Sequence, residues 1–186
     1  LVILLPISIH YLRNKKLKEG LVYISLTVGA WIVINLPFML INFRGWSYFY
    51  EFSYKRAVGA ASIFEVTGML GFGIPTTKAA FYGLNLLALA LVVIYLVKSK
   101  KVVSVADGSF FTMFAFILFN KQYSMQYVIW LASLAILAVF LLEKKFQSRI
   151  LVFYAIWQFS ELIFQYSFFQ RILTGSYKGT ATPASP

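Results

Sequence analysis

A short polar stretch between two apolar runs contains the residue types best suited to chemistry. From Phe119 to Leu131 the sequence reads FNKQYSMQYVIWL. A lysine binds phosphate as a point charge, and mixtures of amides, hydroxyls and aromatic faces recognise sugars. Helix capping plus a polar turn is the alternative. Capping could explain Asn120 and Ser124, but it does not explain Lys121, Tyr123 and Gln126. The substrate-binding candidates in this stretch are Asn120, Lys121, Tyr123, Ser124 and Gln126.

A second group of charged residues lies between residues 44 and 79. Lys55 and Arg56 are cations that could hold a phosphate, or could serve as ordinary anchors to lipid headgroups. Glu51 and Glu65 are carboxylates from which a general base could come. The structural alternative for each carboxylate is an ion pair with Lys55 or Arg56.

Polar side chains also interrupt the last apolar run. Glu161 lies near its middle, and Gln158 is three residues earlier on the same helical face. With Ser160 and Gln165 they predict one polar stripe facing the protein interior. An ionisable group at that depth indicates a functional site. The alternative is a structural hydrogen bond between helices, with Glu161 protonated.

Several kinds of chemistry are excluded by composition. The chain has no cysteine and a single histidine, His10, so a thiolate nucleophile or multi-histidine metal cluster within it is ruled out. Packing is the simpler reading of His10. No glycine-rich phosphate loop or nucleophile triad is present. We therefore expect no metal and no cofactor.

Long apolar runs predict an all-α, polytopic transmembrane helix bundle. Of the 186 residues, 60% are hydrophobic and only 12% are charged, about half the share of a soluble domain. With a partial helix at the N-terminus there are about six membrane segments. A soluble helical domain with a rich core is the alternative. The predicted full spans are Leu21–Phe43, with Pro37 near its end, Ala80–Val97, Val105–Asn120, Tyr127–Leu142 and Ile150–Ile172.

The distribution of cations predicts the orientation of these segments. Three cation-rich connections, residues 13–20, 98–101 and 143–149, fall on one side of the predicted bundle. The positive-inside rule places them in the cytoplasm, so the other connections face outward. The net charge of +11 then indicates contact with anionic membrane lipids, and nucleic acid is not expected as a partner.

The ends of the chain and its long outer connection complete the organisation. We treat residues 1–186 as one transmembrane domain, which begins within a helix and so is expected to be the C-terminal part of a longer protein. In the outer connection, residues 44–79, aromatic side chains recur at helical spacing and predict an interfacial helix. A short surface-lying or re-entrant helix follows, ended by Gly71, Gly73 and Pro75. Residues 173–186 predict a disordered polar tail.

The stretch that contains Lys121 resembles a known signature. It is similar to the NK-x-YS-P-QY-x-x-WL motif of polytopic mannosyltransferases of glycosyltransferase family 87 and related families with the GT-C fold. Met125 stands where that family usually has proline. The segment from Trp46 to Phe64 resembles a looser family pattern that includes Arg56. The two motifs lie between Trp46 and Leu142, about half of the chain.

This resemblance implies a membrane glycosyltransferase. The donor would be a sugar, mannose or another hexose, linked to polyprenyl phosphate, and the acceptor a lipid or glycan on the outer face. Lys121 and Arg56 would contact the donor phosphate; Tyr123, Ser124 and Gln126 would contact sugar or phosphate oxygens. The family's catalytic acid lies in an upstream loop that this chain does not contain. Alternatives are a non-catalytic lipid-binding membrane subunit and a transporter or flippase for lipid-linked sugars.

Overall fold

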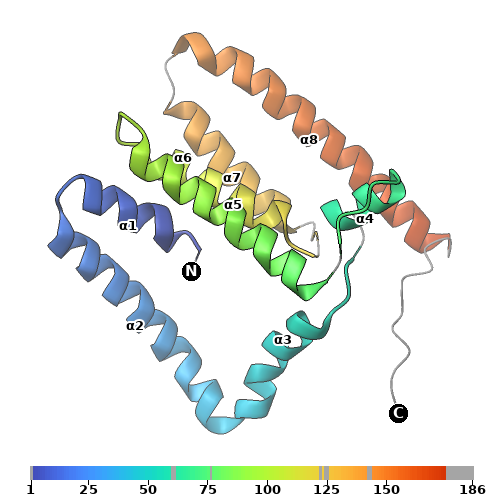
Figure 1. Ribbon diagram of the computed structural model, residues 1–186, viewed down its shortest axis with the longest axis horizontal. Helices are drawn as coiled ribbons and strands as arrows, with labels where there is room; N and C mark the ends of the chain where they lie inside the picture. Colours follow the sequence, from blue (N-terminus) through green and yellow to red (C-terminus); the bar gives the residue numbers. More distant parts are fainter. Residues whose placement is uncertain are drawn as a thin grey trace.

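The computed structural model describes residues 2–59, 62–75, 77–121, 123, 126–141 and 144–174. Within these residues the chain is all-helical and contains no strand (Figure 1). The predicted helical class is therefore confirmed. The helices are α1 (Leu4–Arg13), α2 (Leu17–Ile41), α3 (Phe43–Lys55), α4 (Ile63–Met69), α5 (Lys78–Lys98), α6 (Val105–Leu118), α7 (Gln126–Phe140) and α8 (Lys144–Leu173).

Each apolar run of the sequence became a helix, with bounds that polar residues set. The hydroxyl oxygens of Thr77 and Ser104 accept backbone N–H groups at the starts of α5 and α6, as N-caps do. Asn42 leaves the helical conformation (φ −152°, ψ 82°), so α2 ends four residues after Pro37. The Asn42 side chain then accepts the N–H of Gly45 and so begins α3.

One predicted connection and one predicted tail need separate comment. Residues 143–149 were expected to be a loop, but from Lys144 onward they form the first turns of α8. Lysine, arginine and glutamine are good helix formers, so they extend the helix beyond the apolar run. The tail predicted from residue 173 lies, from residue 175 onward, outside the described residues.

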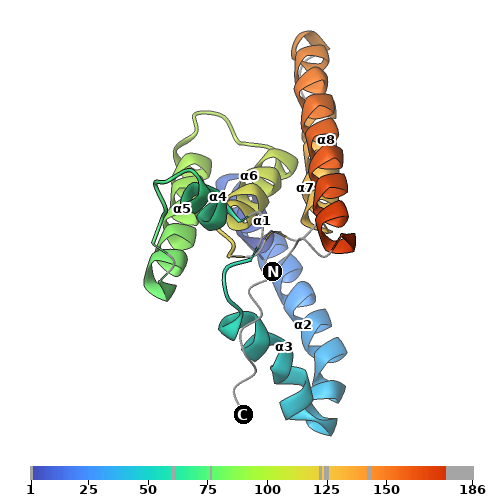
Figure 2. The ribbon, with the colours of Figure 1, turned by 90° about the vertical axis from the view of Figure 1, so that its right-hand side faces the viewer.

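Most of the helices pack side by side, and α2 and α3 extend away from them (Figure 1). α5, α6 and α7 lie side by side, α8 lies against α7, and α1 packs on α5 and α6. Figures 1 and 2 show α2 and α3 forming a V that extends away from these helices. A small core of Met113, Ile117 and Leu131 joins α6 to α7. Much of the remaining apolar surface is exposed, with Leu40 77% and Ile41 83% accessible.

Two helices, α2 and α5, are long and apolar enough to cross a membrane. α6 and α7 are apolar but shorter, and α8 has 30 residues with polar side chains along its length. The sequence predicted about six membrane segments, and among the helices that the structure describes α2 and α5 are the two that meet the criteria of length and hydropathy.

Basic connections gather at one end of the molecule. The Arg13 guanidinium donates hydrogen bonds to the carbonyl oxygens of Leu96 (2.6 Å), Ser99 (2.5 Å) and Lys101 (3.3 Å). These bonds join the α1–α2 connection to the α5–α6 connection. The start of α8 lies toward the same end, whereas α4 and the α6–α7 turn lie toward the other (Figure 1).

Candidate functional site

Lys121 connects the α6–α7 turn to the segment that follows α3. Its ammonium group donates to the Tyr54 carbonyl oxygen at 2.8 Å, and its own carbonyl accepts the N–H of Gly59 at 2.8 Å. The two segments are more than 60 residues apart in sequence. The two motifs that resembled one family are thus in contact at this end of the bundle.

Two further cations accompany Lys121. The Lys78 ammonium, on the first residue of α5, lies 4.1 Å from the ring centroid of Tyr54. The Arg56 guanidinium lies 5.6 Å from the Phe52 ring, directly after α3. Because Lys121 and Lys78 contact the carbonyl and the ring of the same tyrosine, Tyr54 organises the cluster. We call Arg56, Lys78 and Lys121 the cation cluster.

The electrostatics of the cluster favour an anionic ligand. Partial burial, followed by repulsion from Lys78 and Arg56, lowers the pKa of Lys121 below the usual lysine value. In the described part of the chain no carboxylate forms an ion pair with any of the three cations. Like charges held together without a counter-ion repel one another, and a bound phosphate would relieve that repulsion.

Aromatic rings line the surroundings of the cluster. The rings of Tyr54 and Tyr82 stack, with centroids 6.4 Å apart and planes inclined by 16°. Phe81 lies beside Tyr82 and has the Lys121 ammonium 5.8 Å from its centroid. Such rings can pack against a sugar face or an isoprenoid chain while the cations hold a phosphate.

Lys55 points to a different role from its neighbour Arg56. It forms an exposed ion pair with Glu51 at 2.5 Å, one turn apart on α3, and this pair lowers the pKa of Glu51. This ion pair is the structural alternative that the sequence offered for Glu51. Glu65 lies in the first turn of α4, where its N–H donates to the hydroxyl of Ser62, which is the N-cap.

Tyr123 and Glu161 form the contact between the turn and α8. The Tyr123 hydroxyl donates to Glu161 Oε1, and the Glu161 side chain is 8% exposed. Burial, and then the Glu161 carboxylate, raise the pKa of Tyr123. Glu161 thus makes a structural hydrogen bond, but its partner lies in the α6–α7 turn, whereas the structural alternative placed that partner on another helix. The sequence predicted that Tyr123 contacts substrate oxygens, and in the structure its hydroxyl donates to Glu161.

The polar stripe predicted on α8 is only partly present. Gln158 lies one turn from Glu161 and its Nε2 is buried, with no hydrogen-bond partner among the described residues. Gln165 is half-buried. Ser160 is exposed and donates to its own helix at the Ile156 carbonyl, so it is not in the stripe. The correction follows from helical geometry, because neighbouring residues lie about 100° apart around the axis.

The other turn candidates have different positions. Asn120 is half-buried, and its N–H donates to the Ile117 carbonyl just after α6. Gln126 is exposed at the first residue of α7. Ser124, predicted to bind substrate, lies outside the described residues, as do its neighbours Gln122 and Met125.

Sequence reasoning missed Lys78 and the organising role of Tyr54. Lys78 directly precedes an apolar run on the same predicted side as Lys121, a signal that was present in the sequence. Its proximity to Tyr54 depends on where α3 ends, which the sequence does not state. Asn85, inside α5, was also missed, and its amide donates to the Phe116 carbonyl of α6 at 3.1 Å.

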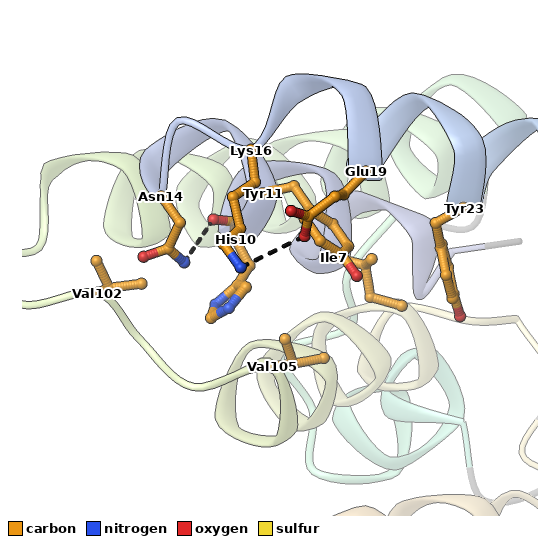
Figure 3. A pocket seen from close by; sticks show the side chains of 9 residues that line it. All are labelled: Ile7, His10, Tyr11, Asn14, Lys16, Glu19, Tyr23, Val102 and Val105. Carbon is orange, nitrogen blue, oxygen red and sulfur yellow. Dashed lines mark hydrogen bonds and ion pairs between the residues drawn. The ribbon is translucent and has the colours of Figure 1, made fainter.

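A hollow of about 660 Å³ lies at the other end of the molecule and contains none of the predicted substrate-binding residues. His10, Tyr11 and Val105 line it between α1, α2 and the start of α6 (Figure 3). The His10 ring is half-buried, with Nδ1 3.4 Å from the Val103 carbonyl. We place the candidate site at the cation cluster because charge and motif residues converge there.

The cluster, its aromatic surroundings and the Tyr123–Glu161 contact make up the candidate site. Comparison of the chain with protein-family models, curated proteins and solved structures gives no match.

Proposed function

We propose that this chain belongs to a membrane glycosyltransferase that moves a hexose, mannose in the simplest case, from a polyprenyl-phosphate donor to a lipid or glycan acceptor. The observation that carries the proposal is the meeting of Lys121 with the segment around Tyr54 and Arg56. This contact forms a cation cluster among aromatic rings. The motif resemblance supports the same reading, because both motifs contribute to the cluster.

The proposed membrane arrangement follows from the distribution of charge. We propose about six membrane segments, with the basic connections in the cytoplasm and the cation cluster at the outer surface. What supports this is the contact of Arg13 with the α5–α6 connection at the opposite end of the bundle. The partners are then the lipid-linked donor, its acceptor and the surrounding lipids.

The reaction places its largest demand on the leaving phosphate. The bond from the sugar C1 to the phosphate oxygen breaks, and a bond from C1 to the acceptor oxygen forms. The phosphate keeps the electron pair, and Lys121 and Arg56 stabilise its charge. The acceptor proton passes to a carboxylate base, to which we assign no residue, because Glu51 is paired with Lys55. The proposal needs no metal or cofactor.

The decisive experiment removes the Lys121 charge. In membranes that contain the protein in its natural form, Lys121→Ala should lower transfer of labelled hexose from polyprenyl phosphate about a hundredfold, as loss of an oxyanion-stabilising group does. Lys98→Ala is the control, because Lys98 is an exposed cation at the far end of α5. Normal membrane insertion of both variants must accompany the result, and unchanged transfer by Lys121→Ala would reject the assignment.

Two other outcomes identify the alternatives. Donor binding without transfer by the unmodified protein would indicate a lipid-binding subunit. Movement of intact donor between the leaflets of a vesicle would indicate a transporter. A transporter would use an ionisable group within the bilayer, and Glu161 is the candidate for that group. In the structure, however, the Glu161 carboxylate accepts a hydrogen bond from the Tyr123 hydroxyl.

A further inference from the structure

Lys78 occupies a position that neither of the resembling motifs covers. It is the first residue of α5, and its exposed side chain crosses to α3, where its ammonium lies 4.1 Å from the centre of the Tyr54 ring. Tyr54 also offers its carbonyl to Lys121 at 2.8 Å. The ammonium groups of Lys78 and Lys121, which come from separate elements, therefore contact the ring and the carbonyl of the same tyrosine.

This arrangement concentrates positive charge. Arg56 follows Tyr54 by two residues, so three cations from three segments surround this point. The ion pairs among the described residues are Lys16–Glu19 and Lys55–Glu51, and neither involves the cluster. The lowered pKa of Lys121 has Lys78 as its larger charge contribution, ahead of Arg56. Three cations that have no ion-paired carboxylate among the described residues are costly together unless an anion joins them.

We propose that Lys78 is a third phosphate-binding residue, which Tyr54 positions so that the headgroup phosphate of a membrane lipid is held between α5, the end of α3 and the α6–α7 turn. The inference rests on the proposed function for the identity of the lipid as a sugar donor. Binding of the phosphate itself follows from charge and geometry. Lys78 and Lys121 bind the phosphate from two sides, and the stacked rings of Tyr54 and Tyr82 form the apolar floor.

Lys78 is proposed to bind the phosphate and Tyr54 to position Lys78, and these two roles predict how substitutions change phosphate binding. Tyr54 holds Lys78 through its ring face, so Tyr54→Phe keeps the contact and Tyr54→Leu removes it. Lys121 contacts the Tyr54 backbone, which both variants retain. Tyr54→Leu should therefore weaken phosphate binding, and should add little to Lys78→Ala in a double variant.

The test measures binding of geranyl phosphate, a short isoprenyl phosphate, to the full protein in nanodiscs of phosphatidylcholine. Lys78→Ala should weaken binding about tenfold or more, as loss of one charged hydrogen bond does, and Lys78→Arg should restore most of it. Lys98→Ala is the matched control, because Lys98 is the last residue of the same helix and is also exposed. Geraniol, which has no phosphate, should not bind measurably.

The outcomes separate this inference from the proposed function. If Lys78→Ala binds like the unmodified protein while Lys121→Ala does not, the role of Lys78 is rejected and the proposed site stands. If Lys98→Ala weakens binding as much as Lys78→Ala, the effect is general surface charge and the inference fails. If phosphate binding depends on Lys78 but no hexose is transferred, the phosphate site stands and the transferase proposal falls. Competition by inorganic phosphate would show that the isoprenyl chain contributes little.

Discussion

At the scale of single residues, the chemistry depends on contacts that join distant parts of the chain. Tyr54 is the clearest case, because its carbonyl binds Lys121 and its ring binds Lys78. Tyr123 also joins distant parts of the chain, because its hydroxyl in the α6–α7 turn donates to Glu161 of α8. The contact with Tyr123 satisfies a buried Glu161 oxygen that would otherwise cost free energy.

The lowered pKa of Lys121 predicts a dependence of phosphate binding on pH. Phosphate binds the protonated amine, and burial with nearby cations makes Lys121 lose its proton at a lower pH than a free lysine. Binding should therefore weaken as pH rises toward the ordinary lysine value of 10.5. Arginine stays charged throughout this range, so Lys121→Arg should lose less affinity than the unmodified protein as pH rises. The check is to measure the affinity for geranyl phosphate between neutral and alkaline pH. The same pH dependence for the unmodified protein and for Lys121→Arg would contradict the prediction.

Removing the Tyr123 hydroxyl should destabilise the protein. Tyr123→Phe leaves the buried Glu161 oxygen without its donor, at a cost of roughly 1–2 kcal/mol in the free energy of unfolding. Tyr166→Phe is the control, because Tyr166 is 67% exposed on the same helix as Glu161. Denaturation of both variants in detergent gives the comparison. Equal stability would show that the hydroxyl contributes nothing.

At the scale of elements, close helix packing depends on small residues. At Gly108 of α6, an added Cβ would lie 2.9 Å from Pro6 Cβ of α1 and 3.4 Å from Leu96 Cδ2 of α5. Gly20 of α2 likewise faces Tyr11 Cβ of α1 at 2.9 Å. Without a strong hydrophobic force between helices in a bilayer, such close approaches supply much of the packing energy.

The glycine contact between α1 and α6 gives a prediction at this scale. Gly108→Ala should lower the free energy of unfolding by about 1–3 kcal/mol, because the ring of Pro6 cannot rotate away. Gly83→Ala in α5 has open space around the new Cβ and should be neutral or stabilising by up to about 1 kcal/mol. Thermal unfolding in detergent micelles measures both. Similar losses for the two variants would mean that α1 does not pack closely on α6.

At the scale of the whole molecule, charge divides the protein into two ends. Arg13 joins two basic connections at one end, and the cation cluster lies with the α6–α7 turn at the other (Figure 1). The first end has the positive charges expected of a cytoplasmic face. The hollow near His10 belongs to that end, away from the proposed site.

The absence of cysteine makes the proposed orientation directly measurable. Each introduced cysteine is unique in the chain. Ser53→Cys on α3 should react with a membrane-impermeant maleimide in intact cells, and Lys100→Cys should react only after permeabilisation. Both positions are exposed. Labelling of both from the same side would show that α5 does not cross the membrane, and the proposed topology would be wrong.

Sequence alone determined where the helices lie. Apolar runs near 20 residues can satisfy their backbone groups in an apolar medium only as helices. The predicted spans 80–97 and 105–120 therefore agree with α5 and α6 to within two residues at each end. Cap residues such as Thr77 and Ser104 then set the ends. The family resemblance marked Lys121 and Arg56, but Lys78 has no motif around it.

Only the tertiary structure decided which of the marked residues meet. It placed Lys121 and Lys78 on Tyr54, paired Lys55 with Glu51, and gave Tyr123 to Glu161. Periodicity locates a residue on its own helix, but the packing of one helix on another depends on side-chain shape at each contact. For that reason the helices could be predicted along the chain, while the cation cluster appeared only when α3, α5 and the α6–α7 turn came together in space.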